Sequence, residues 1–512
     1  YDWFHSFLRN FTKNIIMNFL VSRCSLMEQF DLAICGYGPV GSTFAGLMGK
    51  LGHKVLIIER NIGPSPTARA INTDGEQLRT FDRLGIAEKV VQNSNEVHCV
   101  HFGDANLNPI QTIEQPVGVS AMGWPNQVLF YQPELEGFIR GSVESENNIV
   151  IKEGTELLSF DDSAEGVYLN CKNSDGDLSF FSKYLIGCDG ASSFVRRELD
   201  IDLEDFEYNQ EWLVCDAHLT KRVNIPEKEA MQVCDPKRPG TYVPGRRGHL
   251  RFEFKKMPDE DSKELEKDEN VWKLLKPWIN ENNAKLERAQ VYAFHACIAK
   301  TWRKGNVLIA GDAAHQMPPF MGAGMGTGIR DITNISWKLD LLLKDKAKEG
   351  ILDTYQKERH SHAKWTIAQT VTIGQVIEGF CAAAEGKEYE PKGPSYDVNF
   401  PHIPSGIFSD PADMITGVPI PQPFLLKNDK KEMLDRIINE TFAVLTQESN
   451  LDLTDKAKSI IELLGIKLVS IEPNEDSEER LKTIFEKYKA VLVRPDKYTY
   501  GGVEDISSLS EM

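Results

Sequence analysis

The fold is most strongly constrained by a glycine-rich turn between two apolar segments near the start of the chain. Residues 30–35 form a short, mainly apolar run, and Gly-Tyr-Gly-Pro-Val-Gly follows at 36–41, before a helical stretch that reaches Leu51. A second apolar run over 55–58 ends in Glu59. A G-x-G-x-x-G turn between a strand and a helix, with an acid about 20 residues further on, is the fingerprint of a dinucleotide-binding unit. The sequence therefore predicts a Rossmann-like α/β fold.

Each residue of this fingerprint has an expected task. Gly36 makes the tight turn, Gly38 admits a pyrophosphate, and Gly41 lets the helix pack closely on the strand. Glu59 accepts hydrogen bonds from a ribose 2′-hydroxyl and would repel a 2′-phosphate. We therefore expect a bound dinucleotide at this turn.

A second glycine-rich stretch, at 311–331, is predicted to hold a flavin. It follows the apolar run 307–310, carries Asp312 at the end of that predicted strand, and continues through a Pro-Pro pair and four alternating glycines into a helix. Glycines at this density let the backbone approach a ligand. The start of a helix directs free N–H groups and a positive dipole end at that ligand, which suits the anion of a reduced flavin. In the same stretch, His315 is expected to pack or cap the loop rather than to act as a base.

Length and composition exclude several classes of protein. A chain of 512 residues, 41% hydrophobic and 26% charged, is globular and too long for a single core. The net charge of −18 argues against nucleic acid as the main partner, and the chain has no run of 18 apolar residues to predict a membrane span. The nine cysteines show no C-x-x-C and no His/Cys metal spacing, which predicts reduced thiols, a cytoplasmic location and no metal.

Three motifs together resemble the fingerprints of the single-component, FAD-dependent aromatic hydroxylases, the p-hydroxybenzoate hydroxylase group. They are the G-x-G-x-x-G turn at 36–41, the stretch Asp189-Gly190…Ser193…Arg196, and Gly311-Asp312…Pro318. Segments at 234–245, 353–359 and 493–496 resemble the 3-(3-hydroxyphenyl)propionate hydroxylase subgroup more closely. The resemblance covers about residues 29–500.

The resemblance and the order of predicted elements imply an α/β protein of interleaved domains. A Rossmann-like FAD-binding domain is expected over 27–200, with substrate-sheet strands at about 97–130, and its second part with long helices over 291–394. A substrate-binding β domain is expected over 201–290 and a thioredoxin-like C-terminal domain without redox cysteines over 395–512. Residues 1–26 are expected to be a disordered extension, with a targeting peptide as the alternative.

The resemblance also assigns residues to the cofactor. Arg69, a cation, and Gln132, an amide, suit pyrophosphate and ribityl oxygens. The loop before the second glycine-rich helix is expected to face the flavin ring. The expected FAD-binding residues are Gly36, Gly38, Gly41, Glu59, Arg60, Arg69, Gln132, Asp189, Gly190, Arg196, Gly311, Asp312, Pro319, Gly322, Gly324 and Met325. Asp189 and Arg196 resemble a motif implicated in both FAD and NAD(P)H binding, and NADH or NADPH is expected to bind transiently, because no second complete fingerprint is present.

The implied reaction is the hydroxylation of a phenolic aromatic acid, such as 3-(3-hydroxyphenyl)propionate, ortho to its hydroxyl, with O2 and through a flavin C4a-hydroperoxide. The alternatives are a monooxygenase that modifies a polyketide or antibiotic-type polycyclic substrate, and a flavin-binding sensor or assembly subunit. No side chain identifies itself as the group that activates the phenol. A basic cluster at Lys237, Arg238, Arg246, Arg247 and Arg251 is interpreted as a solvated face. A homodimer is expected from the habit of the family.

Overall fold

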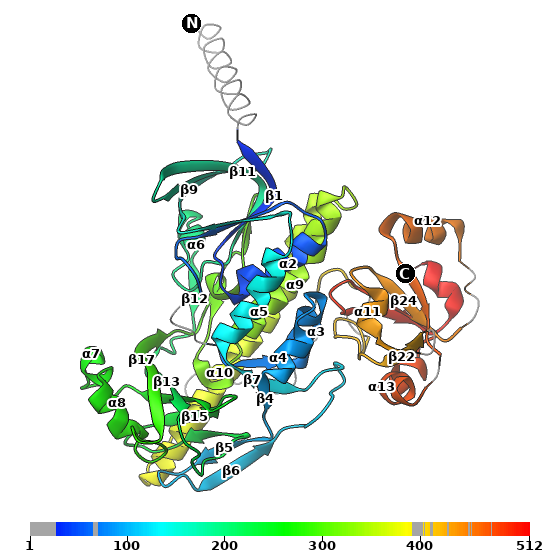
Figure 1. The fold of residues 1–512 in the computed structure, drawn as a ribbon. Helices are drawn as coiled ribbons and strands as arrows, with labels where there is room; N and C mark the ends of the chain where they lie inside the picture. Colours follow the sequence, from blue (N-terminus) through cyan, green and yellow to red (C-terminus); the bar gives the residue numbers. More distant parts are fainter. Residues whose placement is uncertain are drawn as a thin grey trace, which may run out of the picture.

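The computed structural model describes residues 27–64, 70–391, 403, 405–409, 413–427, 430–448, 451, 453–472 and 474–511. The expected N-terminal extension and Arg69 therefore lie outside the described residues. Figure 1 shows a main body built on two large sheets, with helices and smaller sheets around them, and a smaller unit at the C-terminal end beside α3 (Gly75–Arg83) and α9 (Gly324–Leu343).

The central sheet of the body has the strand order β19-β20-β11-β1-β2-β8. Its strands are β1 (Glu28–Cys35), β2 (Val55–Glu59), β8 (Ile149–Glu153), β11 (Gly176–Gly187), β19 (Arg303–Lys304) and β20 (Val307–Ile309), extended along β11 by the hairpin β9 (Glu156–Asp162) and β10 (Val167–Asn173). Strands β20, β11, β1, β2 and β8 are parallel. Because β1, β11 and β20 are adjacent, the segments that follow their carboxyl ends meet at one edge of the sheet.

Helices α2 (Pro39–Lys50), α5 (Gln132–Glu144) and α9 pack side by side on this sheet (Figure 1). The smaller elements of this part are α4 (Ala87–Gln92), α6 (Phe194–Glu198), the sheet of β3 (Asn72–Asp74), β7 (Gln127–Phe130) and β4 (Ser94–Glu96), and the sheet of β12 (Leu203–Asp205), β18 (Cys297–Ala299) and β21 (His315–Gln316). Helix α9 begins at Gly324, so the later glycines of the second glycine-rich stretch are helical. A Cβ on Gly328 would lie 2.7 Å from Val40 Cγ2, so this glycine allows α9 to approach α2.

The second sheet has seven strands in the order β17-β13-β16-β15-β14-β5-β6. Its strands are β5 (Cys99–Gly103), β6 (Pro109–Glu114), β13 (Gln210–Leu219), β14 (Glu229–Val233), β15 (Gly240–Pro244), β16 (His249–Lys255) and β17 (Ala284–Phe294). Side chains of a strand alternate between its two faces. Leu250, Phe252 and Phe254 join a core with α7 (Ser262–Leu265) and α8 (Asp268–Leu275), so Arg251 and Glu253 point to the opposite face.

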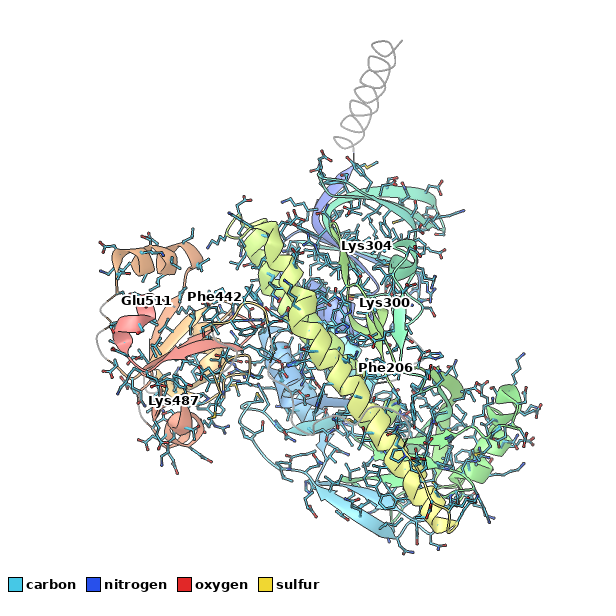
Figure 2. The ribbon with its side chains drawn as sticks, turned by 180° about the vertical axis from the view of Figure 1, so that it is seen from behind. Phe206, Lys300, Lys304, Phe442, Lys487 and Glu511 are labelled. Carbon is cyan, nitrogen blue, oxygen red and sulfur yellow. The ribbon has the colours of Figure 1, made fainter. Side chains whose placement is uncertain are left out.

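One long helix, α10 (Asp353–Ala384), crosses the body (Figure 2). Together with the preceding 3-10 turn η3 (Glu349–Leu352) it spans Glu349–Ala384 and, within the described part of the chain, is the one helix long and apolar enough to cross a membrane by length and composition. Tyr355, Ile367 and Ile377 of this helix are buried inside the fold, and α10 packs on α9. Its apolar composition therefore reflects its place in the core of the body.

The C-terminal unit contains a four-stranded sheet of order β25-β24-β26-β27, in which β24 and β25 are parallel and the other pairs antiparallel. Its elements are β22 (Phe424–Lys427), β23 (Lys430–Met433), α11 (Leu434–Ile438), β24 (Ala443–Thr446), α12 (Asp455–Leu464), β25 (Lys467–Ser470), α13 (Glu475–Phe485), β26 (Ala490–Val493) and β27 (Thr499–Val503). Phe442, labelled in Figure 2, packs edge-on against Trp337 of α9, with ring centroids 5.5 Å apart. A buried ion pair between Arg79 and Asp435, 2.7 Å apart, also joins this unit to the body.

Candidate active site

A cleft of about 300 Å³ lies at the edge of the central sheet where β1, β11 and β20 end. Eight of the residues expected at the cofactor line it together: Gly38, Gln132, Gly190, Asp312, Pro319, Gly322, Gly324 and Met325. They come from segments that are far apart in sequence. The parallel order of the three strands brings these segments to one place.

The first glycine-rich turn shapes one wall of the cleft. Gly36 has a φ of +106°, and a Cβ there would lie 2.4 Å from the carbonyl oxygen of Cys188, so only glycine fits. A Cβ on Gly38 would have no atom within 4 Å, which leaves that backbone open towards the cleft. Glu59 accepts hydrogen bonds from the backbone N–H groups of Tyr37 and Asn61, both at 2.9 Å, and so ties the turn to the end of β2.

The second motif is held by hydrogen bonds of Asp189 and Arg196. Asp189 Oδ2 accepts from the backbone N–H of Val195 at 3.0 Å, while its Oδ1 is buried and has no hydrogen-bond partner within the described residues. Arg196 is buried and donates to the carbonyls of Ala313 at 2.8 Å and Ala191 at 2.9 Å. Arg196 thus links the second motif to the third, which an ordinary solvated arginine would not do.

The third motif is fixed from behind by Asp331 of α9. This carboxylate accepts from the backbone N–H of Gly311 at 3.1 Å, and its Oδ2 lies 2.6 Å from His315 Nε2. Both side chains are fully buried. His315 is thus buried and fixed to α9, as its expected structural role requires, and Asp312 faces the cleft.

Gln132 and Glu136 form the far wall of the cleft. Gln132 accepts a hydrogen bond from the backbone N–H of Ala70 and donates one to Glu136 Oε1, each at 2.6 Å. Burial raises the pKa of Glu136, and its Oε2 has no hydrogen-bond partner among the residues that the structure describes. Sequence reasoning missed Glu136, although its i,i+4 spacing from Gln132 places both side chains on one helix face.

The remaining expected residues lie behind or beside the cleft. Gly36, Gly41, Glu59, Asp189, Arg196 and Gly311 belong to the supporting turns rather than to its lining. Arg60 is exposed at the end of β2. The three motifs therefore meet at the cleft. Some of the expected residues line it, and others form the turns that hold the lining in place.

A second cavity, of about 290 Å³, adjoins the cleft on the side of the seven-stranded sheet. Four residues line both spaces: Ile71, Glu253, Pro319 and Gly322. The cavity wall is mostly apolar, with Val97, Phe102, Leu129 and Phe320 among its members. A ligand in this cavity would lie next to a ligand in the cleft.

The inner face of the seven-stranded sheet carries a buried charged group behind Glu253. Asp216 accepts from Arg251 Nε at 2.9 Å and from Arg288 Nε at 2.7 Å, and His249 Nε2 lies 3.0 Å from it. Burial opposes the charge of Asp216, but Arg251 and the other donors hold its pKa below the ordinary value. The interpretation of the basic cluster as a solvated face is wrong for Arg251, because the strand alternation turns it inward with Asp216.

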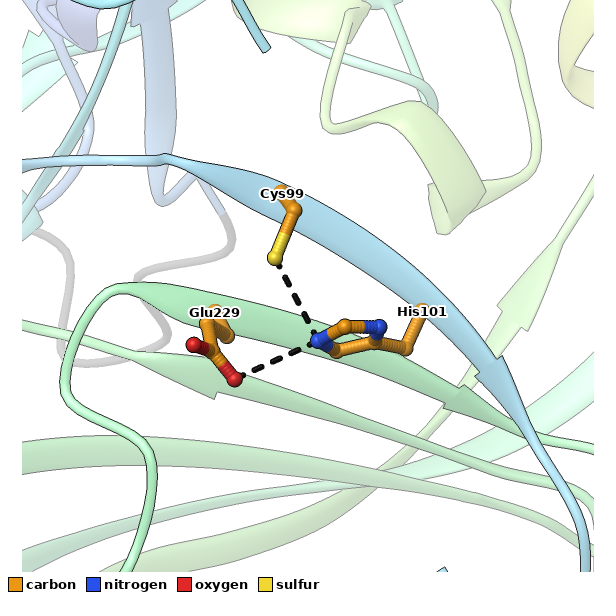
Figure 3. Close-up of side chains that lie close together, drawn as sticks. All are labelled: Cys99, His101 and Glu229. Carbon is orange, nitrogen blue, oxygen red and sulfur yellow. Dashed lines mark hydrogen bonds and ion pairs between the residues drawn. The ribbon is translucent and has the colours of Figure 1, made fainter. Parts of the chain in front are cut away.

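Figure 3 shows a cluster of three potential metal ligands on β5 and β14. His101 Nε2 lies 3.3 Å from Cys99 Sγ and 3.2 Å from Glu229 Oε2, and His101 Nδ1 lies 2.9 Å from Thr112 Oγ1. Burial, followed by the charge of Glu229, raises the pKa of Cys99, whereas a metal would require the thiolate. We interpret this cluster as hydrogen-bonded side chains.

The cleft suits a flavin dinucleotide. The backbone at Gly38 is open on the side where a pyrophosphate would approach, and α9 begins at Gly324 in the wall of the cleft. Glu136 lines the cleft and presents a buried carboxylate oxygen with no partner among the described residues, which could accept from a ligand hydroxyl. The site defines a nucleotide-binding flavoprotein with an adjoining cavity for a second ligand.

Comparisons with known proteins agree with this class. The profile of the FAD binding domain family matches residues 29–370. A protein of Rhodococcus jostii (strain RHA1), named a probable NADH-specific resorcinol 4-hydroxylase, is 29% identical over 510 residues, which cover 94% of each chain. The 3-(3-hydroxy-phenyl)propionate/3-hydroxycinnamic acid hydroxylase of Escherichia coli (strain K12) is 31% identical over 92% of this chain and 91% of its own.

Solved structures share the fold. Aklavinone-11 hydroxylase with FAD and aklavinone superposes with a TM-score of 0.78 at 20% identity, covering 94% of this chain and 98% of the other. The flavin-dependent monooxygenase PieE superposes with a TM-score of 0.81 at 20% identity, covering 94% and 97%. The chain therefore belongs to the family of FAD-binding monooxygenases and is an FAD-dependent aromatic hydroxylase. The resemblance of the three motifs to this family is confirmed.

Proposed function

We propose that this protein hydroxylates a single-ring phenol ortho to its hydroxyl, with NADH or NADPH as electron donor and O2 as oxidant. The observation that carries the proposal is the contact between two spaces, the motif-lined cleft and the apolar cavity, through Ile71, Glu253, Pro319 and Gly322. An aromatic ring in the cavity would face a flavin ring in the cleft. The two relatives described above are named for a resorcinol and for a hydroxyphenylpropionate, which share a phenolic ring.

The residues of the cleft have matching tasks in this proposal. Gly38 and the start of α2 bind the pyrophosphate, Glu59 the adenosine ribose, and Asp312 the ribityl hydroxyls. The segment from Pro319 to Gly322 faces the flavin ring, and the backbone at the start of α9 stabilises negative charge there. Bound FAD supplies the redox chemistry, since it takes electrons from NAD(P)H and activates O2 for transfer of one oxygen atom to the ring.

Exclusion of water is the second task of the protein. The cavity wall packs Phe102, Leu129 and Phe320 around the space that would hold the ring. A dry, apolar wall protects a reactive oxygen species from water and strengthens polar contacts in the site. The volume of about 290 Å³ lies just below the range of ligand pockets, roughly 300–1,000 Å³, which favours one ring over a polycyclic substrate.

The test is substrate-stimulated oxidation of NADH and of NADPH by the FAD-loaded protein. Resorcinol, 3-(3-hydroxyphenyl)propionate, 3-hydroxycinnamate and a polycyclic phenol would be compared under 18O2, with the products identified by mass spectrometry. We expect a single-ring phenol to accelerate oxidation and to gain one 18O atom ortho to its hydroxyl. Stimulation by the polycyclic phenol alone would support the alternative of a polyketide-modifying enzyme. Failure of every phenol to accelerate oxidation would contradict the proposal.

Three further properties belong to the same proposal. The C-terminal unit is thioredoxin-like, which the strand order β25-β24-β26-β27 with α12 and α13 as connections supports. The last cysteine of the chain is Cys381, so this unit has no redox thiols. We also propose a cytoplasmic enzyme that forms a homodimer, which sedimentation of the purified protein would test.

A further inference from the structure

Glu253 is the one titratable side chain among the described residues that line the cavity, and it also lines the cleft. It lies in β16, between β13 and β15, opposite Val214 and Thr241. The residue is only 6% exposed. Its carboxylate is therefore placed where the cleft and the cavity meet, away from bulk solvent.

No described residue donates a hydrogen bond to Glu253 or forms an ion pair with it. The charged side chains near Glu253 bind one another, since Arg251 and Arg288 both donate hydrogen bonds to Asp216. A buried carboxyl group normally has a hydrogen-bond partner. The missing partner of Glu253 is thus expected in the space that it faces, and a phenolic hydroxyl is a donor of the required kind.

We propose that Glu253 is the catalytic residue that binds the hydroxyl of the phenolic substrate and accepts its proton during hydroxylation. The inference rests on the proposed function and names a group that carries out one step of it. A substrate carboxylate would be repelled by Glu253, so the hydroxyl end of the substrate points towards this residue.

The proton transfers balance over the reaction. As a ring carbon ortho to the hydroxyl forms a bond to one oxygen atom derived from O2, the O–O bond breaks, the phenolic O–H bond breaks and Glu253 takes the proton. The same ring carbon then loses its hydrogen as a proton to water, and Glu253 returns its own proton to the phenolic oxygen as aromaticity is restored. NAD(P)H supplies the two electrons that reduce the second oxygen atom of O2 to water.

The environment of Glu253 suits this exchange. Burial raises its pKa to about 7, although Arg251 on the same strand and Arg288 on β17 oppose that shift, while Asp216 on β13 adds to it. The other titratable groups that line the cleft with Glu253 are Glu136, Cys188, His295 and Asp312. A general base is most effective when its pKa lies near the working pH.

The test compares Glu253→Gln and Glu253→Ala with Glu211→Gln as the matched control. Glu211 lies on the neighbouring strand β13, half-exposed and paired with Lys256 at 2.7 Å, outside both spaces. All three variants should bind FAD as the parent does. For the most active phenol, we expect Glu253→Gln to lower kcat/KM by about 100-fold or more and to abolish the limb of the pH profile near pH 7, while Glu211→Gln changes neither. Retention of both kcat/KM and that limb in Glu253→Gln would overturn the proposal.

A measurement of ligand binding distinguishes a failure of the role of Glu253 from a failure of the proposed function. Calorimetric titration of FAD-loaded protein with resorcinol and with 3-(3-hydroxyphenyl)propionate needs no turnover. For each ligand that binds, we expect about tenfold weaker affinity in Glu253→Ala and unchanged affinity in Glu211→Gln. Equal affinities in the parent and in Glu253→Ala would contradict the role of Glu253 even if the parent hydroxylates phenols. Absence of hydroxylation in a parent that binds phenol through Glu253 would contradict the proposed function and the proton transfer, and would leave only the hydroxyl-binding role of Glu253.

The melting temperature gives a readout without any substrate. A folded pKa raised above the unfolded value contributes stability that is complete below about pH 4.5 and lost as the pH rises through 7. The parent should therefore lose stability relative to Glu253→Gln between pH 5 and pH 8, whereas Glu211→Gln should follow the parent. A constant difference between the parent and Glu253→Gln over this range would contradict a buried carboxyl that titrates near pH 7.

Discussion

Arg494 of the C-terminal unit donates a hydrogen bond to Glu358 of α10 at 2.8 Å, and both side chains are fully buried. Glu358 also accepts from Lys338 at 2.9 Å and from Asn334 at 2.7 Å, both in α9. The segments at 353–359 and 493–496 are two of those that resemble the 3-(3-hydroxyphenyl)propionate hydroxylase subgroup, and they lie far apart in the sequence. The structure shows that they meet, where they join the C-terminal unit to the two long helices behind the cleft.

Arg494→Met should destabilise the protein by about 3–5 kcal/mol, because it leaves the buried carboxylate of Glu358 with fewer donors. Denaturant unfolding of the FAD-loaded protein measures this change. Lys482→Met is the control, since Lys482 and Glu486 are exposed and 3.8 Å apart, and it should change stability by less than about 0.5 kcal/mol. Equal effects of the two substitutions would show that the buried pair does not hold the C-terminal unit.

The ion pair between Arg494 and Glu358 also predicts that the protein loses stability in acid. Burial favours the neutral acid of Glu358, but Arg494 and Lys338 outweigh it and lower its pKa to about 2. A lowered folded pKa gives stability that is present above about pH 4.5 and is lost as the pH falls towards 2. The parent should therefore lose on the order of 3 kcal/mol more than Glu358→Gln over this interval, at 1.36 kcal/mol for each pKa unit. Parallel pH profiles of unfolding for the two proteins would contradict this assignment.

Gly38→Ala should weaken FAD binding without harming the fold. Its Cβ would meet no protein atom within 4 Å and would instead enter the cleft, where the pyrophosphate is expected. We expect about tenfold or greater loss of affinity, measured by quenching of flavin fluorescence, with a melting temperature of the apoprotein close to that of the parent. Gly141→Ala, on α5 and equally open, is the control and should leave FAD affinity unchanged.

Arg196→Met should loosen the loop that carries Asp312. Arg196 is buried and its two hydrogen bonds to Ala313 and Ala191 hold the second and third motifs together. We expect lower FAD affinity and a lower melting temperature, with the two losses partly relieved by added FAD. Arg197→Met changes the adjacent, exposed arginine and should have little effect on either measurement. Similar results for the two variants would mean that Arg196 is no more than a surface charge.

The fold elements that carry strong local patterns are those that sequence predicts best. The motif at 36–41 follows β1 and runs into the start of α2 as expected, because glycines at fixed spacing and an apolar strand leave few alternatives. The helix 455–464 matches α12, since its cap at Thr454 and its end at Gly465 are both encoded locally. The division of the chain into domains stays a prediction.

The parts that sequence does not predict depend on contacts between distant strands. Glu253 stands in a run, His-Leu-Arg-Phe-Glu-Phe, whose alternation is typical of a sheet with one solvated face. In the structure that face is buried and faces the cavity and the cleft, so the side chains of Arg251 and Glu253 point inward. The four alternating glycines were expected to precede the helix, but α9 begins at Gly324 and includes the later ones. Close packing against Val40, rather than loop flexibility, requires glycine at 328.

A crystal structure of the protein with FAD and a phenol that it hydroxylates would show directly whether the cleft and the cavity form one active site. We expect the pyrophosphate beside Gly38, the ribityl chain beside Asp312 and the flavin ring beside Pro319 and Gly322, with the phenol in the adjoining cavity. A flavin bound elsewhere, or a phenol separated from the flavin ring by protein, would contradict the claim that the cleft and the cavity form one active site.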